Sequence, residues 1–194
     1  MVRMLCLEVI EKEKVIKEEC VDKELFEEYV NRRKDDSTAV FVLLMTTMFT
    51  NASKGSGGLG ITLTDINGVS RVFYVKGPWS NPYSIFSTNV ADSNTYISVG
   101  TDPTPPSVLD YSLKSKVAEK LAETVSGDIA SRVVTIQATL VFSSAVTIYE
   151  VGLEIDATDR DGVATRLLLD RTVISGGIAV QAGQALRITY RITM

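Results

Sequence analysis

The sequence predicts a mostly β protein: an antiparallel β-sandwich, jelly-roll-like in one version, with one or two helices near its N-terminus. Along the last third of the 194 residues, apolar and polar side chains alternate with the period of two that is typical of half-buried strands. Clusters of Gly, Asp, Asn and Ser separate the alternating stretches, as hairpin turns require. Charge is concentrated in the first 36 residues, which hold 8 of the 20 Lys and Arg and 11 of the 24 Asp and Glu.

Residues 132–194 are expected to form four successive strands, joined by short polar turns. The first alternates over residues 133–142, and Ser143-Ser144-Ala145 turns the chain. On the second strand, one face is expected to hold Tyr149, Val151, Leu153 and Ile155, and the other Ile148, Glu150, Gly152 and Glu154. The third strand is expected to be lined by Val163, Leu167, Leu169 and Val173 against Arg166, Asp170 and Thr172, and to end at Ser175-Gly176-Gly177. The last strand, residues 186–194, has the most regular alternation of all.

The charge boundary near Asp35-Asp36 divides the chain into three parts. Residues 1–50 are expected to form a charged hairpin and a helical segment, residues 51–60 a Gly/Ser linker, and residues 61–194 the sandwich domain. Within the first part, a hairpin centred on Glu13 would set Cys6 opposite Cys20. This leaves two alternatives open, a cross-strand disulfide or two free, partly buried thiols.

Two helices are expected after this hairpin. Asp22 is a candidate cap for a helix over residues 23–34, whose acidic first turns and basic last turn suit the helix dipole. Residues 38–50 are apolar almost all round, which is typical of a buried helix, although their Val and Thr content also suits a buried strand.

The middle of the chain contains further strand and turn signals. Asn67-Gly68 between two β-rich runs predicts a hairpin, and residues 96–99 a short strand. Ser107 and Asp110 have the spacing of a capping box, which favours a helical turn. Residues 114–125 have helical propensity, with Val117, Leu121 and Val125 four apart.

Composition excludes several classes of function. The chain has no histidine, which excludes His-dependent catalytic triads and His-ligated zinc. A net charge of −4 and a pI of about 5.0 give no basic surface for nucleic acid. No apolar run is long enough to cross a bilayer and no secretory signal is visible, so we expect synthesis in the cytoplasm. No cofactor motif is present either, because Gly55–Gly60 neither follows a strand nor opens a helix.

Three groups of residues are candidates for a site. Trp79, Tyr83 and Phe86 suit a carbohydrate-stacking platform, or a plug at one end of the sandwich. Asp156, Asp159 and Asp161 supply oxygens for a calcium loop, although their spacing differs from an EF-hand. Glu150 and Glu154 share a strand face as in a glycosidase pair, but solvated surface charges explain them more simply. The sequence therefore predicts that the protein is not an enzyme.

Several phrases of the chain resemble a known group of proteins in their order along the sequence. They are TAVFVLLMTTMFT, ITLTDINGVSRVF, ISVGTDPTPPSVLDYSLKSKV, VTIYEVGLEI, LLLDRTV and VQAGQALRITYRIT. This order is similar to that of virion structural proteins of tailed phages and of viruses of thermophilic archaea, whose β-modules form tail, fibre or turret parts. The resemblance covers nearly the whole chain, through strand and turn phrases.

The resemblance implies a self-assembling component of a capsid, turret or tail, located in the virion after synthesis in the host cytoplasm. Further copies of the chain and other virion proteins would then be its partners. It also implies that residues 114–125 are extended. The alternative function is a host-facing carbohydrate- or receptor-binding module that uses the loop around Trp79.

Overall fold

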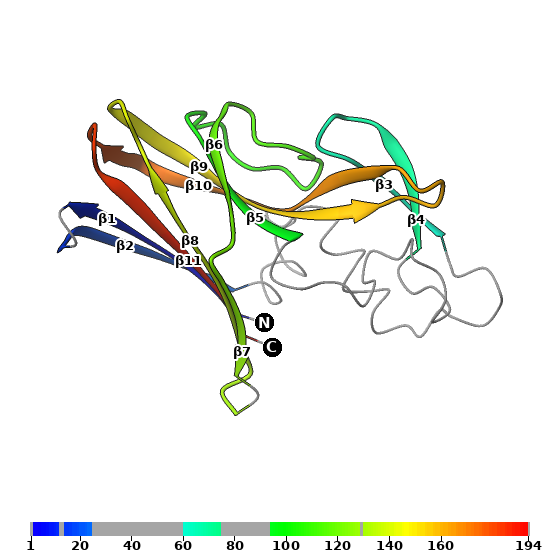
Figure 1. The fold of residues 1–194 in the computed structure, drawn as a ribbon, viewed down its shortest axis with the longest axis horizontal. Coiled ribbons are helices and arrows are strands. Elements are labelled where there is room, and N and C mark those ends of the chain that lie inside the picture. Colours follow the sequence, from blue (N-terminus) through cyan, green and yellow to red (C-terminus); the bar gives the residue numbers. More distant parts are fainter. Residues whose placement is uncertain (1, 12–13, 25–59, 75–93, 129, 194) are drawn as a thin grey trace.

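A computed structural model describes residues 2–11, 14–24, 60–74, 94–128 and 130–193 of the chain, and these residues form three antiparallel sheets (Figure 1). The five-stranded sheet has the order β2-β1-β11-β8-β7. Its strands are β1 (Val2–Glu11), β2 (Lys14–Glu24), β7 (Thr124–Asp128), β8 (Val133–Val141) and β11 (Ala185–Thr193). The four-stranded sheet has the order β10-β9-β5-β6, from β5 (Thr95–Gly100), β6 (Lys116–Leu121), β9 (Val146–Thr158) and β10 (Ala164–Val180). The third sheet is the hairpin of β3 (Gly60–Thr64) and β4 (Ser70–Tyr74).

Alternation along the strands builds the inner face of the five-stranded sheet. The register aligns buried apolar residues of β1, β11 and β8 in three rows. These rows are Leu5, Tyr190 and Ile136; Leu7, Ile188 and Ala138; and Val9, Leu186 and Leu140. They join apolar residues of the four-stranded sheet, such as Ile97, Val99 and Val151, in one hydrophobic core. The period-two prediction for the last strand and for residues 133–142 is therefore confirmed.

The N-terminal hairpin belongs to the same sheet as the C-terminal strand. β1 pairs with β11 from Val2 to Ile10, and β2 pairs with β1. Cys6 lies opposite Cys20, as the predicted hairpin requires, and Cys6 is disulfide-bonded, so the alternative of two free thiols is wrong.

A bulge in β10 decides which charged side chains share a face. Leu168 pairs with Glu154 and Asp170 with Leu153, so the register shifts by one residue at Leu169. Because one extra residue reverses the facing of the strand beyond it, Arg171 and not Asp170 joins Arg166 on the face of Glu154. The predicted set of Arg166, Asp170 and Thr172 is wrong for this reason.

Other local predictions had mixed outcomes. β10 continues through Ser175-Gly176-Gly177, where we expected it to end, with positive φ at both glycines and a shift in register. Residues 116–121 and 124–128 are strands, so the extended alternative for residues 114–125 is confirmed and the helical one is wrong. The capping-box spacing forms a hydrogen-bonded turn, in which Ser107 N–H donates to Asp110 and Leu109 N–H to Ser107 Oγ.

The mostly β, antiparallel class is confirmed, and a sandwich or jelly roll stays a prediction. Most of the two expected helices, residues 25–34 and 38–50, and most of the Gly/Ser linker lie outside the described residues, while Asp22, Lys23 and Glu24 belong to β2. Among the residues described, no helix is long and apolar enough to cross a membrane.

Candidate functional site: a charged face of the four-stranded sheet

The face of the four-stranded sheet that carries Glu150 and Glu154 is rich in charge, yet much of it is buried. Neither glutamate has any exposed surface, and Arg171 has none either. The expectation that Glu150 and Glu154 are solvated surface charges is therefore wrong. They are buried because the loop between β5 and β6, residues 101–115, and the long side chains of neighbouring strands cover them.

The inner group consists of Asp110, Glu150 and Arg171. Arg171 Nε donates to Glu150 Oε2 at 2.7 Å, and its Nη1 donates to Asp110 Oδ2 at 3.0 Å. Arg171 Nη2 has no hydrogen-bond partner in the described structure, and lies 3.7 Å from Asp102 Oδ1. Two carboxylates thus neutralise one buried guanidinium, which removes the large penalty of an unpaired buried charge.

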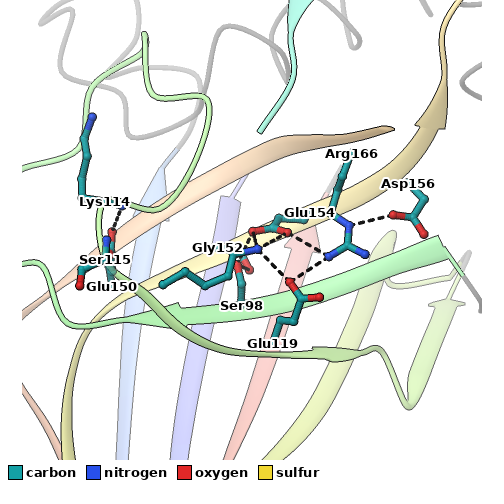
Figure 2. A network of polar contacts seen from close by, with 10 residues as sticks. Ser98, Lys114, Ser115, Glu119, Glu150, Gly152, Glu154, Asp156 and Arg166 are labelled. Carbon is teal, nitrogen blue, oxygen red and sulfur yellow. Dashed lines mark hydrogen bonds and ion pairs between the residues drawn. The ribbon is translucent and has the colours of Figure 1, made fainter. Parts of the chain in front are cut away.

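The inner group fastens the β5–β6 loop to the sheet. Glu150 accepts the backbone N–H groups of Lys114 and Ser115, at 3.1 and 2.7 Å, and so binds the loop where it returns to β6 (Figure 2). Asp110 lies in the loop itself and also pairs with Lys114 Nζ at 2.7 Å. Burial raises the pKa of Asp110, but the bonds from Lys114 and Ser107 and the charge of Arg171 outweigh it, and the pKa is lowered overall.

Glycine makes room for this arrangement at Gly100, where β5 ends. A Cβ atom there would overlap Glu150 Oε1 and lie 2.5 Å from the carbonyl oxygen of Ser115. A Cβ atom on Gly152, between the two glutamates, would likewise lie only 2.7 Å from Ser98 Oγ. The backbones and the loop approach one another so closely that no larger residue fits at Gly100 without a shift of the backbone.

The outer group consists of Lys116, Glu119, Glu154, Asp156 and Arg166, and Figure 2 shows Arg166 between the three carboxylates. Arg166 Nε donates to Asp156 at 2.8 Å, and its Nη1 donates to Glu119 at 2.9 Å and to Glu154 at 3.4 Å. Lys116 Nζ bridges Glu119 and Glu154, at 2.8 and 2.9 Å. The group has three negative and two positive charges and therefore carries a net charge of about −1.

Packing also holds Arg166 in place. Its guanidinium lies over the ring of Tyr96, 3.6 Å from the centroid, an arrangement that favours the cation. Burial opposes the charge of Arg166, but bonds to Asp156 and Glu119 outweigh it and raise its pKa further. The hydrogen bond from Lys116 contributes most to a lowered pKa of Glu119. Both shifts favour the charged forms of Arg166 and Glu119.

An open cleft of about 580 Å³ lies beside the outer group. Its walls come from the β3–β4 turn, the start of β5, β6, and the ends of β9 and β10 that adjoin their shared turn. The polar residues that line it are Asn67, Asn94, Glu119, Asp156, Thr158, Thr165 and Arg166. This volume is within the range of small-ligand sites.

Two hairpin turns of similar sequence meet at one end of the cleft. They are residues 65–69 (DINGV) and 159–163 (DRDGV), and in each the Asp Oδ1 accepts two backbone N–H groups of its own turn. Gly68 and Gly162 hold equivalent positions with φ of 78° and 83°. The predicted Asn-Gly hairpin and Asp-Gly turn are thereby confirmed.

The two turns are bonded to each other in a nearly symmetric way. Ile66 N–H donates to the carbonyl of Arg166, and Arg160 N–H donates to that of Val72. Arg71 lies between the two turns and pairs with Asp65 at 2.7 Å and with Asp159 at 3.0 Å. The β3–β4 hairpin is therefore attached to the tip of β9 and β10 by both polar bonds and a small apolar cluster that includes Phe73 and Leu167.

The structure separates the residues proposed for a calcium loop. Asp159 accepts the bonds just described, Asp156 pairs with Arg166, and Asp161 is largely exposed next to Arg160. Within the described ranges, no group of three or more Cys, Asp or Glu side chains is placed to hold a metal ion. The platform residues Trp79, Tyr83 and Phe86 lie outside the residues described.

Sequence reasoning did not find the roles of Asp110, Arg166 and Arg171. A signal was present in Glu150-Gly152-Glu154, because a glycine inside a strand often marks close approach of another segment. Glu150 and Glu154 cannot act as a glycosidase pair in this conformation, since both are buried and bonded to their own chain.

No protein-family model, curated protein or solved structure matches the chain.

Proposed function

We propose that this protein is a non-enzymatic structural component of a virus particle, a capsid, turret or tail part that assembles with further copies of itself and with other virion proteins. The strand and turn phrases that resemble virion proteins of tailed phages and of viruses of thermophilic archaea support this proposal. So does the use of charge, because the buried carboxylates of the sheet hold the chain's own loops in place. The protein would reach the virion after synthesis in the host cytoplasm.

The observation that carries the proposal is the edge of the five-stranded sheet. β2 is the terminal strand of that sheet, eleven residues long, and among the described residues nothing pairs with its outer side. Such an edge presents a row of backbone N–H and C=O groups to which a strand of another copy can add. Val15 on this strand is 42% exposed, so the edge also offers apolar surface.

The oligomeric state in solution tests the proposal. Light scattering behind a sizing column should give a closed oligomer or larger assembly, because a self-complementary or ring-closing patch is enough for symmetric association. Val15→Asp should shift the population toward monomer, by placing a charge at the edge. The matched control is Val163→Asp, since Val163 is 43% exposed and lies in the β9–β10 turn.

A protein that is monomeric at every concentration tested would contradict self-assembly. Equal effects of the two substitutions would show that the β2 edge is not the contact.

A further inference from the structure

We infer that the cleft beside the outer group binds a neutral polyhydroxylated ligand, a saccharide of one or a few rings. This inference does not depend on the structural role proposed above. It rests on the shape of the cleft and on the chemistry of its walls.

The polar groups of the cleft are held in position before any ligand arrives. Arg166 is bonded to three carboxylates and lies on Tyr96, so neither its guanidinium nor its partners Glu119 and Asp156 are free to rotate. The β3–β4 turn, which supplies Asn67, is fixed by Asp65 and by the bonds to β10. Groups that are already ordered lose little entropy on binding, which favours affinity for a small ligand.

Unused hydrogen-bonding capacity remains on two carboxylates of the outer group. Arg166 donates to Oδ1 of Asp156 and to Oε2 of Glu119. The second oxygen of each carboxylate, Asp156 Oδ2 and Glu119 Oε1, accepts no hydrogen bond within the described part of the chain. Both side chains are more than a third exposed, at 38% and 40%. Carboxylate oxygens accept from hydroxyl groups, and the amide of Asn67 and the hydroxyl of Thr158 can both donate and accept. This mixture suits sugar hydroxyls, which also do both.

The net charge of the outer group excludes the main alternatives. An anion such as sulfate or phosphate would meet three carboxylates, and the nearby cations are already paired with them. A divalent cation would need oxygen ligands without competing cations, whereas Arg166 and Lys116 occupy the carboxylates. The remaining walls include Ile66, Ala157 and Ala164, apolar surface on which the C–H face of a sugar ring can pack.

An array of neutral and charged glycans, followed by saturation-transfer NMR with the glycans that bind, tests the inference. We expect neutral saccharides to bind the wild-type protein. Ala164→Trp should weaken binding by about tenfold or more, because Ala164 is exposed in the cleft wall and the indole would fill the space. Asn67→Ala should weaken it by a similar factor, since it removes an amide and no apolar contact. Val141→Trp, on a largely exposed residue at the end of β8, should leave binding unchanged.

Each other outcome overturns the inference. Silence across the array and in NMR at millimolar saccharide would show that the cleft binds no sugar. Binding that survives both Ala164→Trp and Asn67→Ala would place the saccharide elsewhere. Selective binding of sulfated or sialylated glycans would show that the ligand is an anion. Circular dichroism and a melting curve of each variant establish that it has folded.

Discussion

The inner and outer groups lie on one sheet face and use the same two strands, β9 and β10, but differ in exposure. Arg171 is completely buried between Glu150 and Asp110. Arg166 retains 16% of its side-chain surface, and its partners Glu119 and Asp156 retain more than twice as much. The difference follows from the β5–β6 loop, which contributes Asp110 to the inner group and covers that group. The loop ends where β6 begins, and Glu119 of the outer group lies on β6, beyond the loop.

The comparison shows what each group contributes. Breaking a buried ion pair leaves an uncompensated charge and is strongly destabilising, whereas an exposed pair contributes about 0–1 kcal/mol. The inner group should therefore decide whether the loop and sheet stay together, and the outer group should decide what the cleft can bind. Substitutions in the two groups separate these contributions.

The largest effect is expected from Arg171→Met, which keeps much of the side-chain volume and removes the charge. Glu150 would remain buried without a cation and Asp110 would keep only Lys114, so the free energy of unfolding should fall by about 3–5 kcal/mol. Urea unfolding at neutral pH measures it. Arg166→Met is the matched variant. It should cost less, because its partners Glu119 and Asp156 can be hydrated and the buried Glu154 keeps its bonds from Lys116 and Ser98.

A triple variant sharpens this test. Arg171→Met combined with Glu150→Gln and Asp110→Asn leaves no unpaired buried charge, and should recover part of the lost stability. Equal losses for Arg171→Met and Arg166→Met would contradict the distinction between the two groups.

A smaller effect is expected from Gly100→Ala, which adds one methyl group beside the inner group. The new Cβ would overlap Glu150 Oε1 and the carbonyl of Ser115, and a backbone atom cannot rotate away. We expect a loss of about 1–3 kcal/mol in the free energy of unfolding, as for other overpacked sites.

The control is Gly127→Ala, in β7, where a Cβ would meet nothing within 4 Å. It should change stability by no more than about 0.5 kcal/mol. If Gly100→Ala were as harmless as the control, the loop would not be packed as tightly as the structure shows.

The sequence was informative where one periodic signal determined the structure. β8 and β11 alternate without interruption, and turns with Asp-Gly or Asn-Gly mark the hairpins, so residues such as Ile188 and Gly68 were placed correctly. It was less informative where a single residue changes the register. The bulge at Leu169 moves Arg171 to the face of Glu150, and no local pattern in LLLDRTV predicts it.

Burial of charge was the second limit. A strand with Glu150 and Glu154 on one face has the pattern of a strand with a solvated side, because alternation reports polarity and not exposure. Whether that side is covered depends on residues 101–115, and the loop is attached there by long-range bonds to Glu150 and Arg171. The candidate site therefore depends on contacts between segments far apart in the chain, whereas the strand predictions depended on neighbours in sequence.

The smallest effect expected is a difference in acid sensitivity between the two groups. The pKa of Asp110 and that of Glu119 are both lowered in the folded protein. A lowered pKa means that the unfolded chain binds protons first, so the stability from these groups is complete above an unfolded pKa of about 4. It is lost as pH falls through the folded pKa.

Urea unfolding between about pH 6 and about pH 3 measures this loss. Asp110→Asn should make the decline of unfolding free energy with falling pH shallower, because that carboxylate no longer titrates. Glu119→Gln should change the decline less, since solvent screens its pairs with Lys116 and Arg166. A larger change for Glu119→Gln would reverse the order of the two groups, and would mean that the half-exposed pairs beside the cleft, rather than the covered inner group, attach β6 and its loop to the sheet.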